Sequence, residues 1–160
     1  MHFRPIYIHG EGICYVILRG ENRMGTVHAE LTLKNACDVS IKAKGLIKDH
    51  EVHQITVKAV ADTGAMSLVI NEEIQQKLDL RITDKMSAVL ANGKRANCLV
   101  TEPVEVHWKN RKMTCDAVLV PGAKHVLLGA IPLEGMDLMV NPVTQELVGV
   151  HGEKELILLL

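Results

Sequence analysis

The 160-residue sequence predicts a mainly β domain, closed or sandwiched, with little helix. Three observations lead to this fold class. Short apolar stretches alternate with polar residues at the period of a half-buried strand. Turn-forming dipeptides and charged stretches separate them at short intervals, as in compact β domains. Only one stretch, EEIQQKL at 72–78, carries an N-capping residue and an acidic first turn that favour a helix.

The expected strands of the first half follow from alternation. In MGTVHAELTLKN the apolar positions fall on one face: Val27, Ala29, Leu31 and Leu33. A second strand is expected over 39–43, after a turn around 35–38. The charged stretch KDHEVHQ follows, and then ITVKAVA over 55–61, whose odd-numbered residues share one face. We therefore expect three strands before Asp62.

The second half predicts short strands joined by turns. SLVI forms a strand, and Asn71 is the expected N-cap of EEIQQKL. SAVLANGKRANCLV predicts a hairpin, because Asn92-Gly93 is the dipeptide that a type I′ turn prefers. VEVHW and MTCDAVLV form a second hairpin across KNRK. HVLLGA is another short apolar run, Pro132 opens a single helical turn, and DLMVNP, ELVGV and ELILLL are the last expected strands.

The first 23 residues differ in composition from the rest, because they hold three of the four aromatic residues. RGENRM is also what a purine-rich ribosome-binding sequence followed by ATG would encode in frame. Two interpretations stay open: residues 1–23 are upstream sequence with Met24 as the natural start, or CYVIL is an ordinary extra strand. In either case residues 24–160 are expected to form a single domain.

Composition excludes several classes of protein. A net charge of -1 and a pI of about 6.7 give no electrostatic footprint for nucleic acid or an anionic membrane. No apolar run reaches the roughly 20 residues that span a bilayer. The first residues form no signal peptide, and the four cysteines show no CxxC pair. We expect a soluble, cytoplasmic protein with reduced thiols and with no nucleic-acid or membrane partner.

The most informative stretch is VKAVADTGAMSLVI at 57–70, where an apolar strand ends at Asp62. An aspartate at a strand end is usually a turn former. A carboxylate flanked by apolar backbone, however, needs a partner or a chemical role. Two carboxylates that share one proton can activate a water and protonate a carbonyl. The sequence holds no second D-[TS]-G, so the second Asp62 would come from a second chain around a two-fold axis.

VKAVADTGA resembles the active-site segment of the retropepsin-like aspartic proteases, in which an apolar strand leads into D-T-G-A. HVLLGAIPLEGMDLMVNP is similar to the late segment of that family, in which an apolar pair and a glycine precede a short helix and a strand. The order of motifs over 24–150 looks most like the small bacterial clan AA aspartic proteases. The resemblance implies the acid protease fold, a closed β-barrel with one or two short helices.

The resemblance also implies roles for single residues. Asp62 would be the catalytic carboxylate, Thr63 would bond across the dimer axis, Gly64 would supply an amide near the carboxylate, and Ala65 would line the cleft. The flap, which closes over a peptide, would be Leu90, Ala91, Asn92 and Gly93. Leu127, Leu128 and Gly129 would pack beneath the DTG loop. This flap has one glycine with two cations beside it, unlike glycine-rich retroviral flaps, and the dimer strands would be sought in ELVGV or ELILLL.

No metal or cofactor is expected. His50 and His53 are spaced HxxH, but no cysteine or carboxylate completes a recognised ligand pattern. The leading hypothesis is an aspartic endopeptidase that hydrolyses peptide or protein substrates between the two Asp62 carboxylates of a homodimer. The alternative is a non-catalytic peptide-binding or assembly module on the same fold. Self-processing is a third option, and it requires that residues 1–23 be translated.

Overall fold

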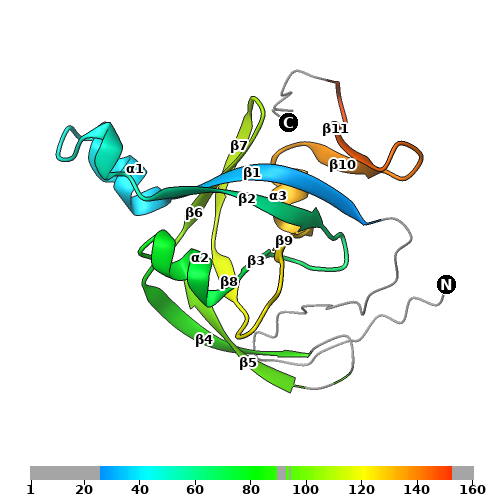
Figure 1. Ribbon diagram of the computed structural model, residues 1–160, viewed down its shortest axis with the longest axis horizontal. Helices are drawn as coiled ribbons and strands as arrows, with labels where there is room; N and C mark the ends of the chain where they lie inside the picture. The colour runs from blue at the N-terminus through cyan, green and yellow to red at the C-terminus, as the bar shows by residue number, and fades with distance from the viewer. Residues whose placement is uncertain (1–25, 90–92, 94, 153–160) are drawn as a thin grey trace, which may run out of the picture.

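The computed structural model describes residues 26–89, 93 and 95–152 (Figure 1). The expected start at Met24, CYVIL and ELILLL lie outside the described residues. The strands are β1 (Val27–Asn35), β2 (Gln54–Ala61), β3 (Leu68–Ile70), β4 (Ile82–Val89), β5 (Arg95–Thr101), β6 (Val104–Trp108), β7 (Arg111–Cys115), β8 (Ala117–Leu119), β9 (Val126–Leu128), β10 (Leu138–Asn141) and β11 (Glu146–Gly149). The helices are α1 (Ala36–Ala43), α2 (Glu72–Lys77) and α3 (Ala130–Gly135), and Asp49–Glu51 is a 3-10 turn.

The fold is mainly β, as predicted, but the expected barrel closure is not found among the described strands. Nine strands form one sheet in the order β4-β5-β8-β3-β9-β2-β1-β6-β7, and β10 pairs with β11 in a separate ribbon. The two end strands of this order, β4 and β7, are not hydrogen-bonded to each other. The described residues also hold three α-helices, where one or two were expected.

The alternating residues of β1 supply much of the core. Val27, Ala29, Leu31 and Leu33 are at most 5% exposed. β1 pairs antiparallel with β2 over eight residue pairs, from Val27↔Ala61 to Lys34↔Gln54. The odd-numbered residues of β2 pack on the same core, which continues through β6 and α2. A smaller cluster, which includes Ala65, Val69 and Leu127, lies against β4 and β5.

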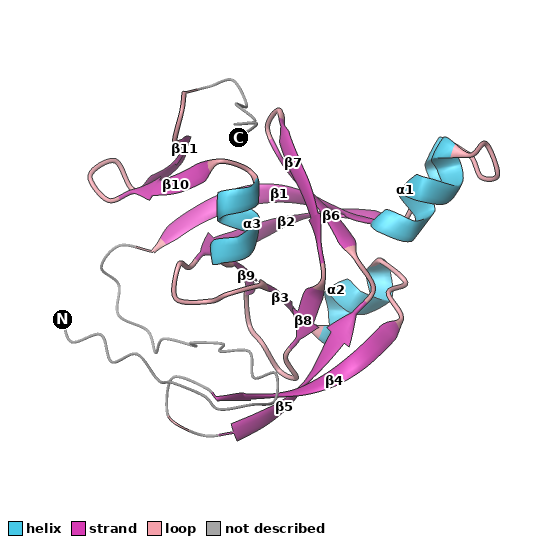
Figure 2. Ribbon diagram, turned by 180° about the vertical axis from the view of Figure 1, so that it is seen from behind, coloured by secondary structure: helices cyan, strands magenta, loops and turns pink. Residues whose placement is uncertain are grey.

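The strand expected over 39–43 is wrong, because these residues belong to helix α1. The side chain of Asn35 accepts hydrogen bonds from the amides of Cys37 and Asp38, at 2.9 and 3.3 Å, and so caps the helix. The helix projects from the end of the β1–β2 ribbon (Figures 1 and 2) and buries no residue. The alternation of apolar and polar residues in VSIKA is typical of a strand. Here, however, no neighbouring element of the described structure covers the apolar side chains, and the capped helix forms instead.

Two other expected boundaries are also corrected. MTCDAVLV is not one strand: it breaks at Asp116 into β7 and β8, which lie at separate places in the sheet. Helix α3 begins at Ala130 with Gly129 as N-cap, so Pro132 lies inside its first turn and does not open it. The N-cap at Asn71 is confirmed, since its side chain accepts from the Ile74 amide at 3.0 Å. No helix within the described ranges combines the length and apolar character that a membrane crossing requires.

A buried carboxylate, Glu102, fastens the α1 end of the sheet. Glu102 is 5% exposed. Its carboxylate accepts hydrogen bonds from the side-chain amide of Asn35 at 3.3 Å and from Arg81 Nη2 at 2.9 Å. Burial by itself raises the pKa of Glu102, but hydrogen bonds from the Arg81 backbone and side chain outweigh it and leave the pKa lowered. The ionised form is therefore the one that the fold stabilises.

This arrangement predicts a specific loss of stability in acid. A carboxylate whose folded pKa is depressed contributes stability above its unfolded pKa, and that stability is lost as pH falls through the folded value. We expect Glu102→Gln to be less stable than the wild type at neutral pH and to lose less on acidification from about pH 5 to pH 3. Urea unfolding midpoints at several pH values measure this. Equal acid slopes for both proteins would contradict it.

Candidate active site

Asp62 directly follows β2, where the strand leaves the sheet. Its amide donates to the Leu128 carbonyl at 3.0 Å, which continues the parallel pairing of β2 with β9 by one more residue. The Asp62 side chain is half-buried. Its Oδ1 accepts a hydrogen bond from the Gly64 amide at 2.9 Å. The strand therefore sets the position of the carboxylate, and the turn sets its orientation.

The turn after Asp62 is short and exposed at its tip. The Ala65 amide donates to the Asp62 carbonyl at 3.0 Å, which closes the turn, and Thr63 and Gly64 are exposed between them. Within the described part of the chain, neither Asp62 Oδ2 nor the Thr63 hydroxyl has a hydrogen-bond partner. Ala65 does not line an open surface as expected, because it is 1% exposed and packs in the smaller core cluster.

The segment Leu127-Leu128-Gly129 contacts this loop directly. Leu128 is fully buried, and Leu127 is 6% exposed. Beyond β9, the amides of Ala130 and Ile131 donate to the carbonyls of Ala65 and Met66, at 2.8 and 2.9 Å. Two distant stretches of sequence thus hold each other through main-chain hydrogen bonds, and the loop that carries Asp62 is supported from β9 and α3.

Gly129 allows this close approach because it has no side chain. A Cβ at this position would lie 2.4 Å from the Ser67 carbonyl oxygen and 2.7 Å from that of Ala65. Both neighbours are backbone atoms, so a methyl group could be accommodated only if the loop moved. The backbone of Gly129 itself is extended, with φ -81°, so the requirement is for space and not for conformation.

We expect Gly129→Ala to destabilise the fold by about 1–3 kcal/mol through overpacking and to displace the Asp62 loop. Gly135→Ala is the matched control: a Cβ there meets only the flexible Met113 side chain, with the sulfur at 2.4 Å. Thermal unfolding of both variants measures the difference. A Gly129→Ala protein as stable as its Gly135→Ala counterpart would show that the contact is not tight in solution.

An apolar pair flanks the loop. Met66 is 47% exposed and Ile131 is 46% exposed, and they are joined through the hydrogen bond from the Ile131 amide to the Met66 carbonyl. Exposed apolar side chains gathered in one place are candidates for an interaction surface. The pair lies beside the exposed Thr63 and Gly64, on the segments that support Asp62.

The hairpin in which the flap was expected forms from β4 and β5, whose antiparallel pairing includes Lys85↔Leu99 to Val89↔Arg95. Three of the flap residues, Leu90, Ala91 and Asn92, lie outside the described residues. Gly93 is exposed and has a positive φ of 77°, which suits glycine in a tight turn. The figures place this hairpin on the side of the molecule away from β10 and β11 (Figure 2).

The sequence did not predict the buried ionic network around Arg111. Arg111 is 1% exposed, and its Nη1 donates to Asp137 Oδ2 at 2.8 Å and to the Met136 carbonyl at 2.7 Å. Asp137 also bonds His151 Nδ1 at 2.6 Å. These contacts join β7 to the β10–β11 ribbon. The only signal in the sequence was an arginine at the start of a strand, which is ordinarily a surface residue.

The two histidines of the HxxH spacing do not form a metal site in the described structure. His53 Nδ1 bonds Asp38 Oδ2 at 2.7 Å, and His50 lies in the 3-10 turn. Among the described residues, no group of three or more candidate ligands could hold a metal ion.

Comparisons with known proteins find one matching family and several similar solved structures. The family described as gag-polyprotein putative aspartyl protease matches residues 48–134, which include the Asp62 loop and Leu127–Gly129. One similar solved structure is "EIAV protease complexed with the inhibitor HBY-793" (14% identity, 72% of this chain, 92% of that chain, TM-score 0.47). Another is the retroviral protease-like domain of Ddi1 from Leishmania major (10% identity, 74% of this chain, 83% of that chain, TM-score 0.48). No curated protein sequence matches the chain.

Proposed function

The chain belongs to the family of gag-polyprotein putative aspartyl proteases, and on that premise we propose that it is an aspartic endopeptidase that acts as a homodimer. The observation that carries the proposal is the Asp62 loop. A strand positions the carboxylate, a backbone amide orients Oδ1, and β9 with α3 supports the turn. The chain supplies one such carboxylate, so water activation needs a second copy.

The proposed reaction uses two Asp62 carboxylates that share one proton. The unprotonated carboxylate takes a proton from a water molecule, whose oxygen attacks the peptide carbonyl carbon, while the protonated partner donates to the carbonyl oxygen. The tetrahedral intermediate then breaks its C–N bond as the amide nitrogen takes the proton that the first carboxylate received from the water. The second carboxylate recovers a proton from a hydroxyl of the intermediate, so the pair again shares one proton. The bond from the Gly64 amide to Oδ1, at 2.9 Å, would keep one oxygen oriented and leave Oδ2 for the water.

Two features of the loop support a dimer in this place. Thr63 and Gly64 are exposed at its tip, and the apolar pair Met66 and Ile131 lies beside them with nearly half of each side chain exposed. A two-fold axis through this surface would bury the apolar pair against its copy and bring the two carboxylates together. The proposed substrate is an extended peptide, covered by the β4–β5 hairpin.

The dimer requirement predicts that activity per chain falls on dilution. A monomer holds one carboxylate, so the specific activity should fall as the protein concentration drops below the dimer dissociation constant. Peptidase assays across a dilution series, with sedimentation in parallel, measure this. Met66→Glu, which places a charge in the proposed interface, should shift the loss to higher concentration, whereas exposed Val143→Glu should not. Activity from a strict monomer would contradict the proposal, and a strict monomer without activity would favour the non-catalytic binding module.

A further inference from the structure

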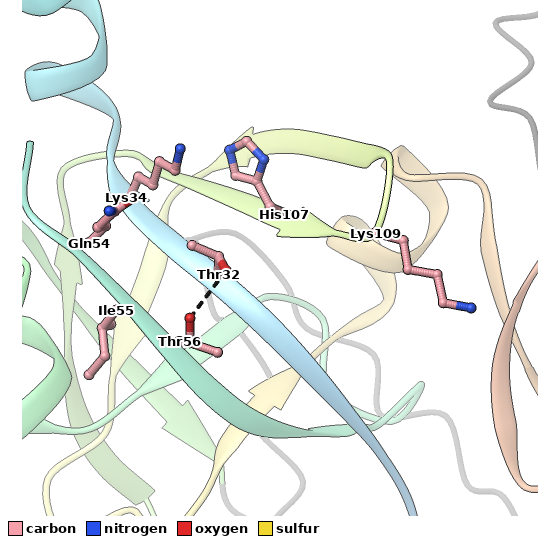
Figure 3. A pocket seen from close by; sticks show the side chains of 7 residues that line it. All are labelled: Thr32, Lys34, Gln54, Ile55, Thr56, His107 and Lys109. Carbon is pink, nitrogen blue, oxygen red and sulfur yellow. Dashed lines mark hydrogen bonds between the residues drawn. The ribbon is translucent and has the colours of Figure 1, made fainter. Parts of the chain in front are cut away.

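A polar groove crosses the outer face of the sheet, on the opposite end of β2 from Asp62. Its volume is about 540 Å³, and it is lined by Thr32, Lys34, Gln54, Ile55, Thr56, His107 and Lys109 (Figure 3). The residues come from β1, β2, β6 and the β6–β7 turn. None of them is acidic, and three carry nitrogen groups that are or can become cationic. The groove therefore has the chemistry of an anion-binding surface.

The strand register fixes how the basic groups are spaced. His107 lies opposite Thr32, and Thr32 lies opposite Thr56, to which its hydroxyl is hydrogen-bonded at 3.3 Å. This row forms the middle of the groove. Lys34 lies two residues along β1 on one side of the row. Lys34 is therefore about 7 Å from the row along the strand. Lys109 also lines the groove, but it follows the end of β6, in the β6–β7 turn, where its φ is 50°.

The lysines are not committed to ion pairs within the described structure. Lys34 forms none, and Lys109 packs over the Trp108 ring, 4.4 Å from its centroid. Two carboxylates lie near Lys34. Asp49 is paired with Lys42, whose hydrogen bond and charge lower the pKa of Asp49, with a smaller contribution from the charge of Lys34. Glu105 lies opposite Lys34 in the strand register, and its side chain is only 12% exposed. Its oxygens are occupied by His107 Nε2 at 2.6 Å and by Lys112 Nζ at 3.4 Å. Glu105 thus holds His107 in place and is shielded from a ligand in the groove.

We propose that this groove binds an acidic segment of a polypeptide in an extended conformation, as an anchoring site for protein substrates away from the Asp62 loop. In an extended chain, residues i and i+2 of one side are about 7 Å apart, which matches Lys34 and the row that holds His107. Residue i+2 would face His107 and the threonine pair. A single phosphate is smaller than a groove of about 540 Å³, and a net charge of -1 gives no general attraction for nucleic acid.

The inference rests on the proposed peptidase function and deepens it by naming a substrate class. Thr56 lies six residues before Asp62 along β2, or about 20 Å. A substrate held at both places would carry its acidic segment at least about six extended residues from the bond that is cleaved. Anchoring at this distance would strengthen binding without changing the chemistry at the carboxylates, so it should lower KM and leave kcat unchanged.

Binding is tested in full-length Asp62→Asn protein, so that no cleavage interferes. The probe is a fluorescein-labelled peptide of four Glu-Ser repeats, with four Gln-Ser repeats as the neutral control, in fluorescence anisotropy at low ionic strength. Lys34→Gln should weaken binding of the acidic probe about three- to fivefold, and Lys34→Gln with Lys109→Gln by about tenfold or more. Lys58→Gln is the matched control, because Lys58 lies on the neighbouring strand β2 and on the same face of the sheet but does not line the groove.

Several outcomes would overturn the groove assignment. The neutral probe could be bound as tightly as the acidic one, or Lys34→Gln and Lys58→Gln could weaken binding of the acidic probe equally. Inorganic phosphate at millimolar concentration could displace the probe, or a single-stranded oligonucleotide could bind more tightly than the probe.

A second experiment measures cleavage by the wild-type protein of a peptide with and without the acidic extension. Binding without any cleavage would leave the groove standing and remove the peptidase proposal. Cleavage with an unchanged KM and no probe binding would do the reverse.

Discussion

Replacing Asp62 with asparagine is expected to lower kcat for peptide hydrolysis by at least about a thousandfold and to leave the fold intact. In the homodimer this change removes both carboxylates, so neither the base nor the acid remains. Asparagine keeps an oxygen that can accept the Gly64 amide, which donates to Asp62 Oδ1 at 2.9 Å. The turn should therefore retain its shape, and the loss should be chemical.

The matched control is Asp79→Asn. Asp79 is exposed at the end of α2 and has a positive φ of 50°, a conformation that asparagine tolerates well. This variant should keep wild-type activity. Thermal unfolding of both variants should stay within about 1 kcal/mol of the wild type, since neither change leaves a buried group unpaired. Undiminished cleavage by the Asp62→Asn protein would refute the assignment of Asp62 as the catalytic group.

The sequence predicted those elements whose burial and local signals agree. The first strand was readable because each odd-numbered residue from Val27 to Leu33 is buried, which gives a clean period of two. The helix after Asn71 was readable because the cap and the acidic first turn are local features. The Asp62 loop and Leu127–Gly129 were found together only through the family resemblance, since 64 residues lie between Asp62 and Leu127.

The failures have a common physical origin in tertiary context. Residues 39–43 alternate apolar and polar, but the buried Asn35 caps a helix that starts at Ala36 and buries nothing. These residues do not pair with any described strand of the sheet, so the alternation stabilises no strand, and the Asn35 cap favours the helix. Likewise MTCDAVLV looks like one strand, yet its two halves pair with β6 and with β3 and β5. Pairing partners, and so the closure of a sheet, are not encoded in local alternation.

The burial of Arg111 is another tertiary feature that its local sequence does not indicate. Arg111→Met is expected to destabilise the fold by about 3–5 kcal/mol, because removal of one partner from a buried ionic network leaves the others uncompensated. Arg111 is 1% exposed, and its guanidinium donates to the carbonyls of Met136 and Asp137 and to the Asp137 carboxylate, at 2.7 to 2.9 Å. Methionine fills similar volume but offers none of these donors.

The neighbouring Lys112→Met is the control, since its side chain is 63% exposed and forms one pair with Glu105 at 3.4 Å. Its cost should stay below about 1 kcal/mol. Urea unfolding measures both variants. A cost for Arg111→Met no larger than that for Lys112→Met would mean that the network contributes nothing beyond an exposed pair.

The acid dependence separates the ionic part of this effect from lost packing. The Arg111 hydrogen bond, with a smaller contribution from His151, lowers the pKa of Asp137. A lowered pKa means stability that is present above the unfolded value and is lost as pH falls through the folded one. Wild-type protein should therefore lose stability in acid through Asp137, and Arg111→Met should lose less stability over the same pH range.

A second change, Asp137→Asn, made in the Arg111→Met protein, should restore part of the stability lost at neutral pH, because it removes the carboxylate that was left without its cation. If the double variant is no more stable than Arg111→Met, the guanidinium acts by filling space and by bonding the carbonyls, and the charge pair is incidental to holding the β10–β11 ribbon against β7.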